Sequence, residues 1–157
     1  MTIRIARMSL LFLLIATVLV VFSPPAMAQS RAGVRAGISV DPTQFYFGGH
    51  VDVKEIVEKF WFRPNAEIGV GDGITTFTLN GEFVYFPAVR SREWTPYFGG
   101  GPAFVLGTVK RNGVRDTDVG PGFNFVGGIQ QRQGLLAEIK IGAIDSPNFK
   151  LGIGWTW

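Results

Sequence analysis

The feature that most constrains the fold of this chain is a two-residue alternation of apolar residues with polar residues or glycine. It recurs in eight successive segments: Gly33–Val40, Gln44–Val53, Phe62–Gly71, Thr76–Tyr85, Tyr97–Leu106, Val119–Gln130, Leu135–Gly142 and Phe149–Trp157. Successive side chains of a β-strand point to opposite faces, so this period predicts strands rather than helices. Each segment is close to the roughly 9–11 residues that a tilted strand needs to cross a bilayer.

Three stretches depart from the alternation or carry a turn signal. Val53–Lys59 could form a helical turn, and we interpret it as the link between the second and third segments. Asn80-Gly81 is a common hairpin signal, but the alternation continues through it and places it inside the fourth segment. Lys110–Asp118 is polar, and we expect it to be the longest loop at one end of the molecule. The short loops expected at the same end are Asp41–Thr43, Gly71–Gly73 and Asp145–Asn148.

The volume of the side chains indicates which face of these strands points inward. The apolar face holds much of the aromatic content of a chain with 14 Phe, whereas the polar face holds many of its 21 Gly. Eight strands enclose only enough room for packed side chains or one small ligand, so these rings would be hard to fit inside. Glycine on a water-facing surface would weaken the strands without any gain. We therefore expect the apolar face to point outward to lipid.

The inward face carries four basic and four acidic residues, which we expect to pair as a charge network that plugs the lumen. They are Arg35, Asp52, Arg63, Glu67, Glu82, Glu138, Lys140 and Lys150. Paired charges can be buried, whereas an isolated buried charge is very costly. The alternative is that the same residues are solvated on the surface of a soluble protein.

Several aromatic residues lie near the ends of the segments. These residues are Trp61, Tyr85, Trp94, Trp155 and Trp157. Trp and Tyr favour the boundary between membrane and water, so we expect these rings there. Ordinary aromatic packing is the alternative.

Residues 1–28 have the three parts of a secretory signal peptide. Arg4 and Arg7 are basic, Leu10–Phe22 is apolar apart from one Thr, and Ala26-Met27-Ala28 provides the small residues that a signal peptidase requires. A retained transmembrane helix is the alternative, but the apolar run is shorter than the roughly 20 residues that spanning needs. We expect cleavage after Ala28, which leaves residues 29–157 as a single barrel domain.

The composition and motifs exclude several classes of function. The chain has no cysteine, so it has neither disulfides nor the lipid-attachment site of a lipoprotein, and it has no basic run that would bind nucleic acid. His50 is the only histidine, and Ser39 and Ser91 lack a flanking nucleophile motif. Asp116-Thr117-Asp118 could bind Ca²⁺ weakly, but solvation of a loop explains it as well. We expect no catalytic residue, no cofactor and no metal site.

Two further motifs carry a resemblance to a known group of proteins. Pro96–Phe104, PYFGGGPAF, looks like the PYxGxGxGx strand of small outer-membrane barrels, and the chain ends in an alternating strand with a final aromatic residue. The chain resembles the OmpA/OmpX-like superfamily over its whole mature length. The resemblance implies a Gram-negative outer membrane and a terminal strand recognised by the barrel-assembly machinery. The residues of this assembly signal would be Phe149, Leu151, Ile153, Trp155 and Trp157.

The sequence thus predicts an all-β, eight-stranded, antiparallel up-and-down transmembrane β-barrel after a cleavable signal peptide. We expect a porin-like monomer in the cell outer membrane, reached by secretion through the inner membrane, with a structural or surface-interaction role and no enzymatic activity. Its expected partners are outer-membrane lipid, the barrel-assembly machinery and periplasmic chaperones. The alternative is a soluble periplasmic, lipocalin-like barrel that binds a small apolar ligand; an outer-membrane enzyme acting on lipid is a third hypothesis.

Overall fold

The computed structural model describes residues 30–88, 93–111 and 114–157. Its strands are β1 (Arg31–Val40), β2 (Gln44–Asp52), β3 (Lys54–Val57), β4 (Phe60–Gly71), β5 (Ile74–Tyr85), β6 (Trp94–Arg111), β7 (Val114–Gln131), β8 (Leu135–Ile144) and β9 (Phe149–Thr156). Within the described ranges, no helix is long and apolar enough to cross a membrane. The predicted signal peptide, residues 1–28, lies outside the described residues.

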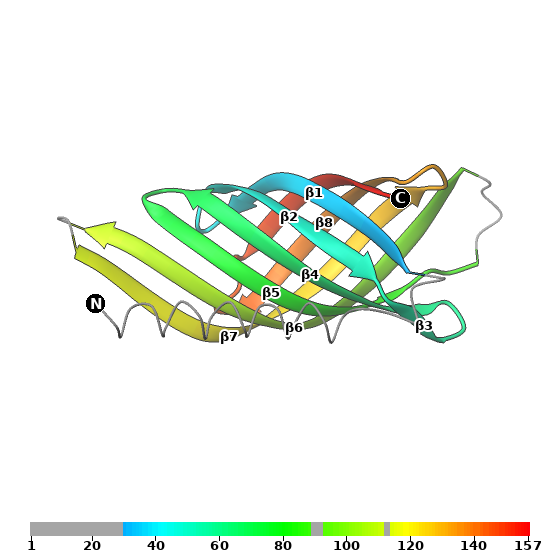
Figure 1. The fold of residues 1–157 in the computed structure, drawn as a ribbon, viewed down its shortest axis with the longest axis horizontal. Helices are drawn as coiled ribbons and strands as arrows, with labels where there is room; N and C mark the ends of the chain where they lie inside the picture. Colours follow the sequence, from blue (N-terminus) through cyan, green and yellow to red (C-terminus); the bar gives the residue numbers. More distant parts are fainter. Residues whose placement is uncertain (1–29, 89–92, 112–113) are drawn as a thin grey trace, which may run out of the picture.

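The strands form one closed antiparallel sheet (Figure 1). Strands that follow one another in the chain pair with each other, except β2 and β3; in addition, β1 pairs with β9, and β2 pairs with β4. The short β3 also lies against β4, directly after β2, so β2 and β3 together occupy one position in the wall. Counted in this way, the barrel has the eight strands that the alternation predicts, and the fold prediction is confirmed.

The segment after β2 is not the simple link that we expected. Residues 54–57 form β3, which pairs with the start of β4 through Lys54 opposite Phe62. Lys59 closes the turn with a left-handed φ of 68°, and its backbone N–H donates to the Glu55 carboxylate. The β-branched residues of this segment and the available edge of β4 explain why it forms a strand and not a helical turn.

The prediction of a long loop at Lys110–Asp118 is also wrong, because most of this segment belongs to strands. β6 and β7 pair with each other as far as Arg111 opposite Val114, and the hydroxyl groups of Thr108 and Thr117 lie 3.2 Å apart. Polar side chains are compatible with a strand where a hairpin leaves the barrel, since its backbone is satisfied by pairing. In Figure 1 this yellow-green hairpin extends beyond the other strands, at the end away from the C terminus. Asn80-Gly81, in contrast, lies within β5 as predicted.

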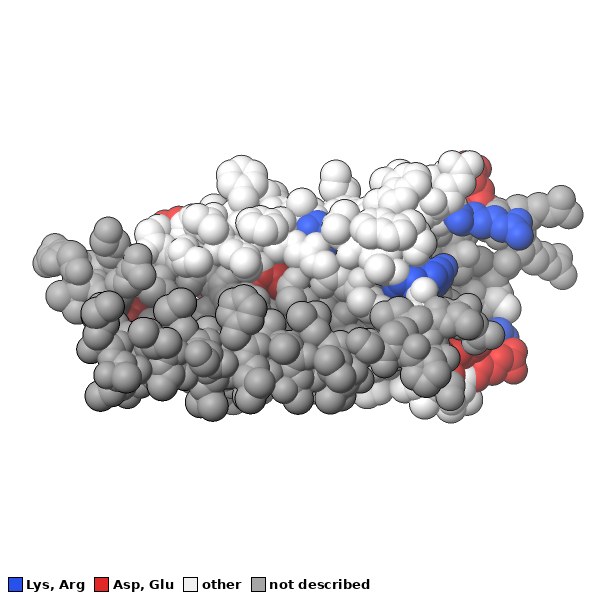
Figure 2. Space-filling model, viewed as in Figure 1, with Lys and Arg blue, Asp and Glu red and all other residues white. Residues whose placement is uncertain are grey.

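The two faces of the wall have the orientation that the volume argument predicts. Arg63 and Glu82 are 0% exposed inside the barrel, whereas Phe45 and Ile153 on the outside are 76% and 67% exposed. In Figure 2 the described part of the visible face is mainly uncharged, and many of its charged atoms gather at the end that holds the C terminus. The barrel therefore buries its charges and exposes its large apolar side chains.

Trp61 does not lie where the membrane-interface prediction puts it. It stands two residues before Arg63 on β4 and so shares the inward face of the strand. There it packs against a small buried cluster formed by Val84, Tyr97 and Val126. The alternation of β4 already placed Trp61 on the same face as Arg63, and nearness to a strand end was the weaker signal.

Candidate functional site

Glycines on the inner wall make room for the long side chains of the lumen. Arg35 on β1 lies opposite Gly48 of β2 on one side and opposite Gly154 of β9 on the other. Two residues farther along β1, Gly37 lies between Tyr46 and Gly152, and a Cβ atom at Gly152 would meet the Tyr46 hydroxyl group. The missing side chains thus allow Arg35 and Tyr46 to lie across the neighbouring strands inside a narrow barrel.

A first group of charges, the central cluster, consists of three cations and three anions. Its members are Arg35, Glu67, Glu82, Glu138, Lys140 and Lys150, and all six are buried. The Lys140 ammonium donates to Glu67 and to Glu82, each at 2.6 Å, and Lys150 donates to the other oxygen of Glu67 at 2.7 Å. Arg35 Nη1 donates to Glu138 at 2.7 Å and lies 3.8 Å from Glu67 and from Glu82. Each carboxylate of the cluster is therefore within ion-pair distance of two or more cations.

Two tyrosines border the central cluster. The Tyr97 hydroxyl donates to Glu138 at 2.9 Å and satisfies the oxygen that Arg35 does not contact. The Lys150 ammonium lies 5.2 Å from the centre of the Tyr46 ring, which is within range of a cation–π interaction. The rings fill space between strands, so the cluster is enclosed by side chains as well as by the barrel wall.

A second group, the mouth cluster, consists of Arg31, Asp52, Arg63 and Gln130. Arg63 Nε donates to Asp52 at 2.5 Å, and its Nη2 donates to Gln130 at 3.1 Å. Arg31 also donates to Asp52, at 3.1 Å, but its side chain is 45% exposed. Arg31 begins β1, and Figure 1 places the start of that strand near the C terminus, which locates this cluster at that end of the lumen.

Aromatic rings cover the arginine of the mouth cluster. The Arg63 guanidinium lies 5.5 Å from the Phe86 ring centre and 4.9 Å from that of Tyr97. The two rings contact each other with centroids 5.4 Å apart, and Trp61 packs on the same cluster. Arg63 therefore has a carboxylate on one side and aromatic faces on others.

The eight charged residues predicted for the lumen all point inward, but they lie in two groups. Among the described residues, no ion pair joins the central cluster to the mouth cluster. A ladder of neutral amides adds a third layer of contacts, in which Asn80 donates to Asn65 at 2.7 Å and Asn124 donates to Asn80 at 2.6 Å. The sequence analysis did not include Arg31 in the charge network, although Arg31 lies four residues before Arg35 and so on the same face of β1. It also did not predict that the Tyr97 hydroxyl donates to Glu138.

The structure gives the possible catalytic residues separate partners. His50 Nε2 lies 3.0 Å from Thr156 Oγ1 inside the barrel, and its Nδ1 has no hydrogen-bond partner among the described residues. The Ser39 hydroxyl donates to the backbone oxygen of Pro42 at 2.8 Å. Ser91 lies outside the described residues. Within those residues, no group of three His, Cys, Asp or Glu side chains could hold a metal ion.

The residues predicted as an assembly signal lie along the last strand. Leu151, Ile153 and Trp155 point outward from β9, and Phe149 shares their face. Trp157 follows the strand, and its backbone N–H donates to Ala32 at 2.9 Å. The end of the chain is thus fixed to β1, at the seam that closes the barrel.

No family model matches the chain, and no curated protein matches its sequence. Solved structures do match. The N-terminal β-barrel domain of Pseudomonas aeruginosa OprF is similar with a TM-score of 0.64 and 10% identity, covering 82% of this chain and 96% of that one. Neisserial surface protein A, NspA, is similar with a TM-score of 0.65 and 12% identity, covering 81% and 94%. The chain has the fold of a small outer-membrane β-barrel.

This likeness confirms, at the level of the fold, the resemblance to OmpA/OmpX-like barrels. Both comparisons cover nearly the whole of the known barrel, so the match is to a complete domain and not to one hairpin. At 10–12% identity the likeness concerns the fold, and the interior of this small barrel has to be interpreted from its own residues.

Proposed function

We propose that the protein is an integral, monomeric, non-enzymatic β-barrel of the bacterial outer membrane, with a structural or surface-interaction role. The observation that carries the proposal is the inversion of the barrel, with charges buried in the lumen and large apolar side chains exposed around the outside. Soluble monomers rarely expose a contiguous apolar patch of more than a few hundred Å². A bilayer removes this difficulty, because lipid covers the apolar belt.

The same inversion argues against the soluble lipocalin-like alternative. A barrel that binds an apolar ligand needs an apolar interior, but the centre of this lumen holds Lys140 between two carboxylates. An apolar ligand would have to displace these ion pairs and leave charges unpaired in a low-dielectric space, which is very costly.

We further propose that the lumen is closed to ions. The central cluster fills the middle of the barrel with side chains that are bonded to one another, and Phe86 and Arg63 cover the end near the C terminus. Interiors of eight-stranded barrels are usually just wide enough for side chains to fill them. A structural or surface role needs no conducting pore.

The free edge of the β6–β7 hairpin supports the monomeric state. β7 pairs with β8 only from Gly122 onward, so the preceding residues present one edge without a neighbouring strand. Pro121 has no N–H group to offer there, and the N–H of Val119 is bonded at 2.9 Å to the carboxylate of Asp118. Proline and charged residues on an edge are known means of preventing strand addition. The hairpin therefore offers side chains at the surface, but a poor edge for pairing with another chain.

Targeting and assembly complete the proposal. Residues 1–28 would act as the secretory signal, and the outward row of the last strand would be read by the barrel-assembly machinery, with periplasmic chaperones as transient partners. Catalysis is not part of the proposed role, since His50 and Ser39 each bond to a different group.

Membrane fractionation tests the proposed function. We expect the mature protein in the detergent-extracted outer-membrane fraction, with faster gel migration before heating than after it. Recovery in the osmotic-shock extract would contradict the membrane location and favour the soluble barrel. Reconstitution into planar bilayers tests the closed lumen separately, and a steady ion conductance through the unaltered protein would contradict that part.

A further inference from the structure

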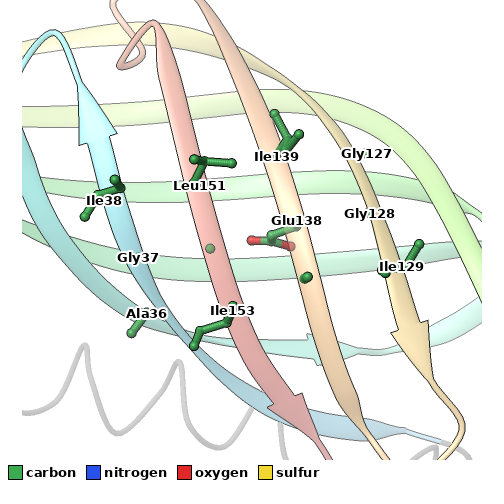
Figure 3. A pocket seen from close by; sticks show the side chains of 12 residues that line it. Ala36, Gly37, Ile38, Gly127, Gly128, Ile129, Glu138, Ile139, Leu151 and Ile153 are labelled. Carbon is green, nitrogen blue, oxygen red and sulfur yellow. The ribbon is translucent and has the colours of Figure 1, made fainter. Parts of the chain in front are cut away.

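The outer wall of the barrel has a concave region on one side. It has a volume of about 670 Å³ and spans β1, β9, β8 and β7, which lie side by side (Figure 3). We call it the outer groove and define it by the outward residues Ala36, Ile153, Ala137, Ile139 and Gly127. This volume falls within the roughly 300–1,000 Å³ of ligand pockets in proteins.

Small residues in the register of the strands create the outer groove. On one row, Ile153 lies between Ala36 and Ala137, and on the next row Ile139 lies opposite Gly127. The wall formed by β4, β5 and β6 differs, because aromatic rings there contact one another: Phe60 lies 6.1 Å from Tyr85, and Tyr85 lies 5.4 Å from Phe98. These rings fill the outer face of that wall, whereas the small residues leave the outer groove open.

The outer groove continues toward the end of the barrel that holds the C terminus. A second concavity of about 440 Å³ shares Ala36 and Ile153 with it and reaches Leu135 and Trp155. Leu135 begins β8, and Trp155 is its register partner on β9. Together the two concavities form an elongated apolar groove along the outer wall, which suits a chain-like ligand.

We propose that the outer groove holds one acyl chain of a phospholipid from the inner leaflet of the outer membrane. This inference rests on the proposed membrane location. A gap beside an apolar wall loses dispersion contacts, and small residues allow a neighbouring chain to approach the backbone closely. An acyl chain can enter such a gap from the bilayer without breaking any hydrogen bond.

The charges at the two ends of the groove select the leaflet. Arg132 is exposed in the turn directly before Leu135, at the end where the second concavity finishes. Asp41 and Asp145 are exposed at the opposite ends of the same strands. The carboxylate of Glu93, which accepts from Gln131 at 3.2 Å, precedes β6 and so lies on the far side of β7 from the groove. Arg132 therefore attracts a phosphate at the first end, and the two aspartates repel it at the second. An even number of strands returns a secreted chain to the side from which it inserted, so the Arg132 end faces the periplasm and the inner leaflet.

A second copy of the chain fits the outer groove less well. Two copies inserted in the same direction would meet around a two-fold axis, and such an axis brings identical patches together. A concave patch would then face another concave patch and leave a void between them. A lipid chain has no such constraint.

The inference is tested by measuring the phospholipid that stays bound to the barrel purified in mild detergent, by native mass spectrometry. We expect the unaltered protein to retain one phospholipid, and Ala36→Phe and Ala137→Phe to weaken that retention by about tenfold because the ring fills the groove. Ala66→Phe is the matched control, since Ala66 lies on β4 outside the groove. Arg132→Gln should weaken retention of an anionic phospholipid. Lys59→Gln, in the turn between β3 and β4 and away from the groove, should not.

Several outcomes would overturn the inference. Equal retention in Ala36→Phe and Ala66→Phe would exclude the groove as the site. Retained lipopolysaccharide in place of phospholipid would contradict the leaflet, and a dimer lost on Ala36→Phe would show that a second copy occupies the groove. A folded barrel in the outer-membrane fraction with no retained lipid would overturn this inference and leave the proposed function intact. A protein recovered from the soluble fraction would overturn both.

Discussion

The central cluster and the mouth cluster bury charge in two different ways. In the central cluster, cations and carboxylates are equal in number, and Lys140 bridges Glu67 and Glu82. In the mouth cluster, the Arg63–Asp52 pair is buried, but Asp52 also contacts Arg31, whose side chain is half exposed. In the central cluster each charge thus has a buried side chain of opposite charge beside it, whereas Asp52 in the mouth cluster also has a partly solvated partner, Arg31.

This difference matters because a buried ion pair is costly to break from one side. Removing one partner leaves the other as an uncompensated charge in a low-dielectric environment. In the central cluster the loss of Lys140 would remove its hydrogen bond to Glu82 and leave three buried carboxylates with two cations, but in the mouth cluster Arg31 remains beside Asp52 after Arg63 is lost. We therefore expect the two clusters to differ in how strongly they depend on a single residue.

The largest effect should follow from Lys140→Met. The methionine side chain is nearly as long but uncharged, so three buried carboxylates share two cations, and the free energy of unfolding should fall by about 3–5 kcal/mol. Urea unfolding in lipid vesicles, followed by the shift in gel migration on heating, measures the change. The double variant Lys140→Met with Glu82→Gln restores the charge balance and should recover a large part of the loss. A fall of less than about 1 kcal/mol in the single variant would mean that the remaining cations and water satisfy these carboxylates without Lys140.

Arg63→Met should destabilise the barrel less, by about 2–3 kcal/mol, because Asp52 keeps Arg31 as a partner. The methionine can still pack against Phe86 and Tyr97, so the loss reports mainly on charge. The same unfolding measurement, made under the same conditions for Arg63→Met and Lys140→Met, compares the stability that each variant loses. If the two variants lose equal stability, the redundancy that we attribute to Arg31 does not exist.

The division of the wall into two faces could be predicted from the sequence, because the period of a strand is fixed by its backbone geometry. The alternation placed Arg35 and Glu82 inside, and the glycines opposite Arg35 in the register explain how that long side chain fits. The pairing of charges could not be predicted. Lys140 on β8 meets Glu82 on β5, and that contact depends on the stagger of the closed barrel rather than on either local sequence.

The errors at Lys110–Asp118 and at Trp61 have different physical reasons. Polar residues are equally suited to a loop and to a hairpin that stands in water beyond the barrel, so composition could not separate the two for Lys110–Asp118. Trp61 was placed at the interface by its nearness to a strand end, although its parity puts it on the face of Arg63. Where the two signals disagree, the two-residue alternation is the more reliable one, since it follows from strand geometry, whereas the interface preference of Trp is statistical.

Phe86→Ala tests whether the aromatic cover or the central cluster closes the lumen. The ring is half-buried over Arg63, so its loss should cost about 1–2 kcal/mol, less than the 3–5 kcal/mol of a fully buried ring. We expect no rise in ion conductance in planar bilayers, because the central cluster lies deeper in the lumen and remains intact. A clear rise in conductance would show that the aromatic cover is the closing element.

The smallest effect is expected for Arg31→Ala, below about 1 kcal/mol, because exposed ion pairs gain little over solvation by water. Arg63 still donates to Asp52 through two nitrogen atoms in this variant. The informative measurement is the double variant Arg31→Ala with Arg63→Met, which leaves Asp52 without either arginine. If Arg31 is the reserve partner, the double variant should lose more stability than the sum of the two single variants, since only then does a carboxylate stay unpaired inside the barrel. Simple additivity would mean that the half-exposed Arg31 does not compensate for the loss of Arg63, and that Asp52 depends on Arg63 alone.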